Sequence, residues 1–196
     1  MIVLADSANL LLVSWQNFYV MVGSSAGALI GLQFVVITLI GGSRKRTSME
    51  TVNAFGTPIV VQFGGALTIC GIMVAPWPSV HTISIALALC GVAGLGYATV
   101  VLRRARHQTQ YRPIAEDWFW YVMSPFVTYA AIAIAAVLVW VSTAAGLFVA
   151  AGATLSLLLI GSRNAWDTVT HLISKGFEES EDSRDPQSGE ARGEDS

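Results

Sequence analysis

The sequence predicts an all-α integral membrane protein, a close-packed bundle of five transmembrane helices. Hydrophobic residues make up 54% of the chain and charged residues only 12%, about half the charged fraction of an ordinary globular protein. Five apolar runs reach the length of about 20 residues that a helix needs to cross the hydrocarbon core. These runs lack the alternation of barrel strands, and open strand edges would leave backbone groups unpaired in lipid. The expected spans are 18–41, 58–77, 83–102, 119–141 and 144–160.

The segments between these runs alternate in character. Polar and basic residues follow the first and third runs, whereas proline and tryptophan mark a tight turn after the second. The weakest boundary lies at 142–143, and without a turn there the chain has four spans. A helix over 119–160 would measure roughly 63 Å at about 1.5 Å per residue. A bilayer core is only about 30 Å thick, so five spans are favoured.

Two flanking segments accompany the expected bundle of residues 17–162. Apolar residues recur at helical spacing over 1–16, which predicts an amphipathic segment on the outer surface. A similar stripe over 163–176 predicts an extension of the last helix into the cytoplasmic interface. The tail over 177–196 is acidic and nearly without apolar residues, so we expect it to be disordered.

All eleven Lys and Arg residues can be placed on one side of the membrane. Basic flanking residues resist translocation, so the N-terminus is expected outside and the C-terminus in the cytoplasm. Without the acidic tail a small positive surplus remains beside the membrane; it suits anionic lipid headgroups and is too dispersed for nucleic acid. The basic residues expected at the interface are Arg44, Lys45, Arg46, Arg103, Arg104 and Arg106.

The sharpest motif is the run of glycines at Gly23, Gly27 and Gly31 in the first span. Residues four apart share a helix face, so the three glycines predict a flat surface on which another backbone can pack closely. That backbone belongs either to a second copy or partner protein, or to another span of the same chain. Further glycines and alanines in the later spans predict close packing throughout.

Polar residues within the spans are few and uncharged. None of the five spans holds Asp, Glu, Lys, Arg or His in its interior, which argues against a pump or a proton-coupled transporter. Gln33 and Gln62 are the most polar side chains at this depth and should either hydrogen-bond another helix or line a neutral pore. Pro58 is expected in the first turn of the second span, and Pro125 is expected to kink the fourth.

Candidate catalytic and metal-binding residues are sparse. Cys70 and Cys90 have no metal-ligand spacing and are expected to be free thiols, so we expect no metal and no cofactor. An enzyme would have to use the cytoplasmic rim, but the residues there match no hydrolase or phosphotransfer motif. Those rim residues are His107, Glu116, Asp117, Asp167 and His171.

The segment from Trp15 through Phe18, Tyr19 and Gly23 to the Gly-Ala-Leu-Ile-Gly-Leu stretch at 27–32 resembles small integral membrane proteins of bacteria. Most of these are uncharacterised, and some are described as modulators of a membrane-bound protease. The resemblance covers the first span. It implies a multi-pass protein of the bacterial inner membrane and carries over no mechanism and no functional residue.

Three functions follow as hypotheses. The favoured one is a non-enzymatic membrane protein that assembles with itself or with a partner membrane protein through its glycine face. The second is a small channel or carrier for a neutral or anionic solute, and the third is a lipid-modifying enzyme at the interface.

Reporter fusions test the orientation. A fluorescent protein that matures only in the cytoplasm should fluoresce when fused after Ser196, because the basic residues hold that end inside. Alkaline phosphatase, which needs the periplasm, should be inactive there. As the control, phosphatase inserted at 78–82 should be active. Phosphatase activity after Ser196 would reverse the topology.

Overall fold

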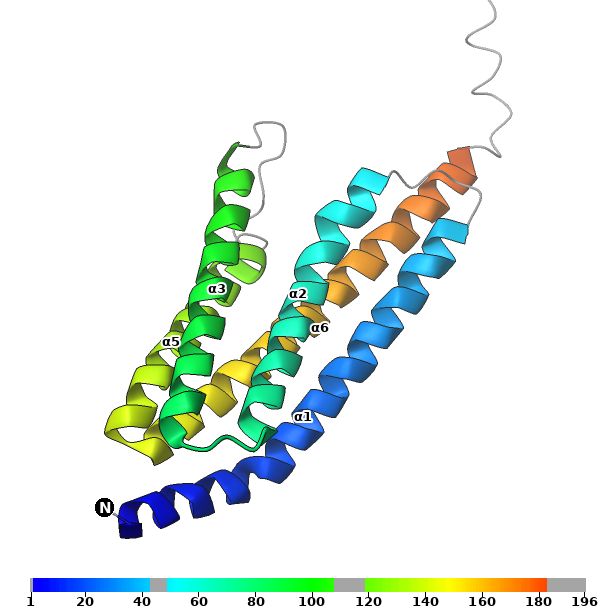
Figure 1. Ribbon diagram of the computed structural model, residues 1–196. Coiled ribbons are helices and arrows are strands. Elements are labelled where there is room, and N and C mark those ends of the chain that lie inside the picture. Colours follow the sequence, from blue (N-terminus) through cyan, green and yellow to red (C-terminus); the bar gives the residue numbers. More distant parts are fainter. Residues whose placement is uncertain (1, 43–48, 108–118, 183–196) are drawn as a thin grey trace, which may run out of the picture.

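The structure is a computed structural model. It describes the backbone of residues 2–42, 49–107 and 119–182, and the side chains of 12–39, 57–103 and 119–170. The described residues form helices throughout, joined by short turns (Figure 1). In chain order the elements are α1 (Ile2–Gly42), α2 (Met49–Val74), α3 (Val80–His107), the π-helical turn η1 (Phe119–Met123), α5 (Ser124–Val141) and α6 (Thr143–Asp182).

Five helices are long and apolar enough to cross a membrane, which confirms the predicted fold class. Spans four and five are separate because the backbone at Ser142 is extended, with φ −150° and ψ 99°, and so ends α5. The described residues therefore contain five candidate spans and not four. They cover Leu12–Leu39, Thr57–Val74, Val80–Arg103, Phe119–Val141 and Thr143–Thr170.

Several helix ends differ from the expected ones. Pro58 lies in the first turn of the span that begins at Thr57, as predicted, but α2 itself begins at Met49, so the proline is inside the helix and not at its start. The helix ends at Val74, where the Trp77 indole Nε1 donates a 2.6 Å hydrogen bond to the carbonyl oxygen of Ile72. That bond satisfies one of the carbonyls that a helix end leaves open.

The flanking segments join the long helices. Residues 2–16 are the start of α1 and run at an angle to the rest of that helix (Figure 1). At the other end of the chain α6 continues past the expected limit at residue 176. Residues 183–196, most of the expected disordered tail, lie outside the described part of the chain.

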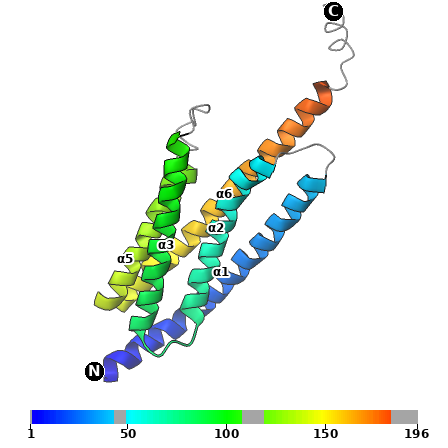
Figure 2. The same cartoon turned by 45° about the horizontal axis from the view of Figure 1, so that its top comes forward.

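Helix α6 holds the bundle together. It packs against α5, α2 and α1, whereas α3 packs mainly against α5 and only lightly against α2. Figures 1 and 2 both show α6 crossing the bundle obliquely, while α3 and α5 form a pair that leans away from α2. Helices α2 and α3 therefore diverge, and the bundle is less tightly packed between them than between α3 and α5.

Glycines bring the helices together as expected. A Cβ atom built on Gly91 of α3 would lie 2.8 Å from the backbone nitrogen of Ala133 in α5. One on Gly161 of α6 would lie 2.6 Å from the Phe63 ring of α2. Carbon atoms at van der Waals contact are about 3.5–4.0 Å apart, so no larger residue fits at either site without movement.

Tyr129 of α5 is the side chain around which α2, α3 and α5 meet. It is 3% exposed, and its ring lies directly on Gly94 of α3, so close that a Cβ there would overlap the ring. Its hydroxyl oxygen would lie 2.8 Å from a Cβ on Gly65 of α2. Two helices thus carry glycine where this tyrosine needs room.

The predicted break at Pro125 takes the form of a π-helical turn. Pro125 lies in the first turn of α5, directly after η1. Proline has no N–H and its ring collides with the carbonyl four residues earlier, here that of Tyr121. A π turn widens the helix at this point and so relieves the collision.

The glycine under Tyr129 should be required for stability. Gly94→Ala should lower the free energy of unfolding in detergent by about 1–3 kcal/mol, because the added methyl meets the buried ring. Gly96→Ala is the matched control, since a Cβ at Gly96 meets nothing within 4 Å. Denaturant titration followed by circular dichroism measures both, and equal stability of the two variants would contradict the packing described.

Candidate functional site

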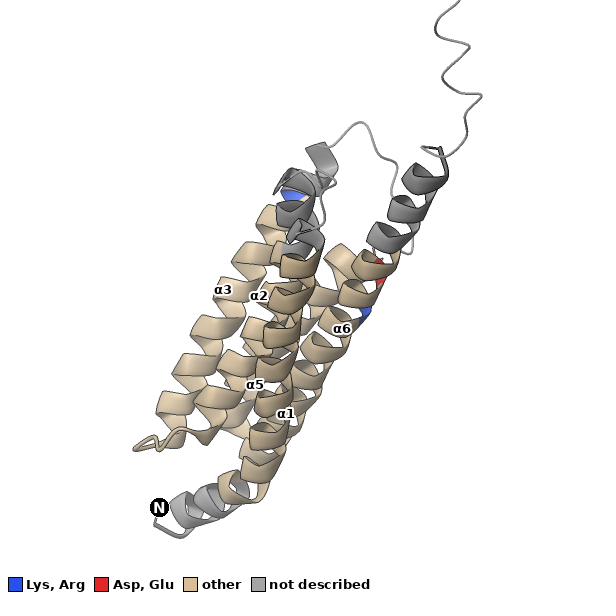
Figure 3. Ribbon diagram, turned by 90° about the vertical axis from the view of Figure 1, so that its right-hand side faces the viewer, with Lys and Arg blue, Asp and Glu red and all other residues tan. Residues whose placement is uncertain are grey.

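The charged residues among the described side chains gather at one end of the bundle, called the basic end below. They are Arg103 on α3 and the pair Arg163 and Asp167 on α6 (Figure 3). Helix α1 ends and α2 begins at this same end (Figure 1). Charge, polar side chains and a pocket all occur at this end.

A buried pair of amides joins α2 to α6. The Asn164 Nδ2 donates a 3.2 Å hydrogen bond to Gln62 Oε1, and the two residues are 0% and 3% exposed. Gln62 therefore makes an interhelical bond, one of the two roles predicted for it. Asn164 Oδ1 has no hydrogen-bond partner among the described residues, although a buried amide oxygen without one is costly.

The π turn η1 is tied to α6 beside this pair. The Tyr121 hydroxyl donates a long, 3.4 Å hydrogen bond to the carbonyl oxygen of Asn164. The Arg163 guanidinium lies 4.7 Å from the centre of the Trp120 ring, a cation–π contact. Arg163 Nε also lies 3.8 Å from Asp167 Oδ2, one turn along the same helix. Three elements, α2, η1 and α6, thus meet around one polar cluster.

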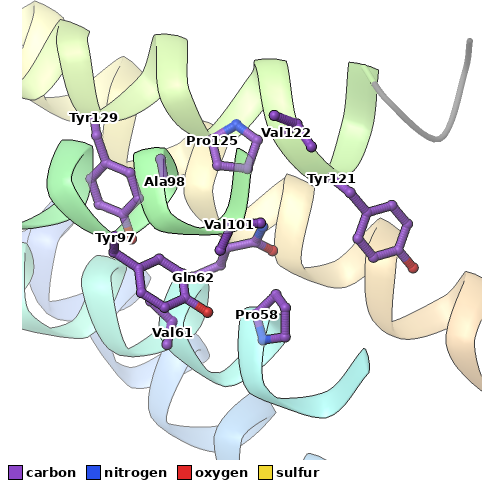
Figure 4. A pocket seen from close by; sticks show the side chains of 10 residues that line it. All are labelled: Pro58, Val61, Gln62, Tyr97, Ala98, Val101, Tyr121, Val122, Pro125 and Tyr129. Atoms are coloured by element: carbon purple, nitrogen blue, oxygen red, sulfur yellow. The ribbon is translucent and has the colours of Figure 1, made fainter. Parts of the chain in front are cut away.

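A crevice opens next to the cluster, between α2 on one side and α3 with α5 on the other (Figure 4). Its enclosed volume is about 10 Å³, far below the volume of a small-molecule site. The enclosed part has room for about one water molecule. Its lining residues are Pro58, Val61, Gln62, Tyr97, Ala98, Val101, Tyr121, Val122, Pro125 and Tyr129.

The three predicted contact glycines of α1 separate into two groups. Gly23 faces α2, where a Cβ would lie 2.9 Å from Cys70 Cβ, so it serves packing within the chain. Gly27 and Gly31 are exposed, and a Cβ on either meets nothing within 4 Å. Ser24 is exposed on the same face. We call Ser24, Gly27 and Gly31 the outer glycine face.

The other predicted site residues lie apart from this face and from the crevice. Gln33 is buried at 6% exposure on the inner side of α1, and Cys70 and Cys90 are free thiols. Within the described side chains no three His, Cys, Asp or Glu residues come together as metal ligands. The remaining candidates have side chains outside the described residues: Arg44, Lys45, Arg46, Arg104, Arg106, His107, Glu116, Asp117 and His171.

Sequence reasoning missed Asn164 and the tyrosines of the crevice. Asn164 continues the spacing of Leu157, Ile160 and Gly161, all of which are buried. An asparagine in register with an apolar stripe is the signal that could have identified it. The tyrosines carry no such signal, because their meeting depends on how three helices lean against one another.

No protein-family model, curated protein or solved structure matches this chain. The resemblance of its first span to small bacterial membrane proteins therefore stays a prediction.

The amide pair should contribute measurably to stability. Gln62→Leu leaves Asn164 buried without its partner and should cost about 1–3 kcal/mol. Adding Asn164→Leu should recover part of that loss, with a coupling energy of about 0.6 and at most about 1.7 kcal/mol. Thr68→Val, which removes only a bond to its own helix, is the control. Strictly additive effects in a double-mutant cycle would show that the amides do not interact.

Proposed function

We propose that this chain is a non-enzymatic integral membrane protein that works by assembly, with the outer glycine face of α1 as its contact surface. The observation that carries the proposal is the open space above Gly27 and Gly31 on a helix at the edge of the bundle. Lipid tails give helices no hydrophobic drive to associate, so a flat face that lets backbones approach is what favours association in a membrane.

The partner that we propose is a second copy of the chain. Two copies of α1 related by a two-fold axis would place Gly27 and Gly31 against each other, because a two-fold contact uses the same patch twice. Val20 and Val35, exposed at 49% and 54%, border the face and would pack against the facing backbone. The crossing expected for such a pair is right-handed, at about −40°.

The two rival functions receive less support from the geometry. For a channel or carrier, Gln62 would have to line a path, but the space that it lines has room for about one water molecule and its Oε1 accepts a hydrogen bond from Asn164. For an enzyme at the rim, Asp167 would have to be available for chemistry, but it is paired with Arg163. Of these two contacts, the amide bond holds two helices together, and the ion pair lies within α6.

We further propose that the protein lies in the bacterial cytoplasmic membrane with its basic end inside. The described charges gather at that end, and in the sequence every other Lys and Arg follows the first, third or fifth span. Anionic headgroups of the inner leaflet would attract this end.

Replacing a glycine on the outer face tests the assembly. Gly27→Leu should convert the oligomer to a smaller species in mild detergent, because the leucine keeps the two backbones apart. Size-exclusion chromatography with light scattering measures the mass of the protein without its detergent. Gly96→Leu, also at an open position but on α3, should leave the size unchanged. An unchanged size for Gly27→Leu removes the self-assembly proposal.

A further inference from the structure

The enclosed part of the crevice has the size of one water molecule. Its volume is about 10 Å³, which is about the least that a single water needs. Three helices line it, with Gln62 on α2, Ala98 on α3 and Tyr129 on α5 (Figure 4). The space lies where α2 packs only lightly against α3, so side chains of the two helices do not close it by direct contact.

The Tyr129 hydroxyl is a buried polar group beside this space. The residue is 3% exposed, and its hydroxyl has no hydrogen-bond partner among the described residues. The hydroxyl oxygen is nevertheless not sealed from a molecule of the size of water. A buried hydroxyl without a partner costs stability, so a hydrogen-bonding occupant of the space would stabilise the bundle.

Gln62 brings a second such group to the same space. Its Oε1 accepts the hydrogen bond from Asn164, which leaves the two donors of Nε2 without a partner among the described residues. Gln62 is also 3% exposed, and Nε2 is not sealed from water either. The Tyr129 hydroxyl lies 2.8 Å from a Cβ built on Gly65, one turn of α2 after Gln62, so both groups meet the same stretch of α2.

Water is the occupant that fits both the volume and these two groups. A buried water molecule commonly makes about three hydrogen bonds to polar groups that have no other partner. It can accept one from Gln62 Nε2 and exchange another with the Tyr129 hydroxyl, and Tyr97 also lines the space. An apolar molecule would leave both groups unpaired. A divalent cation would need six or more oxygen ligands, and no Asp or Glu is among the lining residues.

We propose that the crevice is a binding site for one ordered water molecule, which bridges Gln62 on α2 to Tyr129 on α5. The water joins α2 to the pair of α3 and α5, where direct contact between the helices is light. This site is separate from the outer glycine face of α1 and does not depend on assembly.

Radiolytic labelling tests for the water. A brief X-ray pulse on the full-length protein in detergent converts bound water to hydroxyl radicals, which oxidise the side chains that the water touches. Tyr129 should be labelled several-fold faster than Tyr19, which is similarly buried at 1% and whose hydroxyl donates a hydrogen bond to the carbonyl oxygen of Leu147. Equal labelling of the two tyrosines would overturn the proposal.

Variants that fill the space locate the water. Ala98→Val enlarges a lining residue and should expel the water, so labelling of Tyr129 should fall several-fold. Ala93→Val, at an exposed position of the same helix, is the matched control and should leave the labelling unchanged. Val101→Ile, a smaller enlargement of the lining, replaces Ala98→Val if circular dichroism shows that the latter does not fold. Labelling that persists in a folded, filled variant would refute the site.

A density map that resolves ordered water gives the direct test. One peak should lie about 2.5–3.2 Å from both the Tyr129 hydroxyl oxygen and the Gln62 amide, and Tyr129→Phe should remove it. A map that shows waters elsewhere in the protein but none in the crevice would contradict the proposal.

Discussion

Close backbone approach is the constraint on which this structure depends. In lipid, apolar surface gains nothing by leaving its solvent, so helices must be held by dense packing and by bonds between polar groups. Here glycine makes the dense packing possible, at Gly91 against α5 and at Gly94 and Gly65 around Tyr129. Polar groups also join the helices: the Ser84 hydroxyl, for example, donates a 2.6 Å hydrogen bond to the carbonyl oxygen of Ala136. These contacts join helices that lie far apart in the sequence.

The polar cluster and the crevice follow from the same constraint. Where α2 and α3 lean apart, none of the described glycines brings the two into contact, and α2 is held by α6 through Gln62 and Asn164. The amide pair thus stabilises the side of the bundle that its helices leave open. A protein built in this way combines a firm centre with a light contact between α2 and α3, and its α1 leaves Gly27 and Gly31 exposed.

The fold class could be read from the sequence, because span length and the lack of charge are set by the bilayer itself. The break at Ser142 was also predictable, because one unbroken helix over 119–160 would be about twice as long as the bilayer core is thick. Helix ends such as Met49 could not be predicted, because a helix can continue beyond the membrane, where no apolar run marks its end. For the site, Gln62 was predictable as a buried polar residue, whereas its pairing with Asn164 depends on the oblique path of α6. Likewise, the sequence could not show that Gly23 packs within the chain while Gly27 and Gly31 are open, because this depends on where α2 lies.

The π turn before Pro125 limits which deletions this chain can accept during evolution. A π turn contains one residue more than the regular helix, so the side chains at its start are rotated by about 100° around the axis relative to α5. Loss of a single residue between Phe119 and Met123 would reverse that rotation and turn Trp120 and Tyr121 away from α6. The spacing of this short segment, more than the chemistry of any one of its residues, is then what ties the paired helices α3 and α5 to the rest of the protein at the basic end.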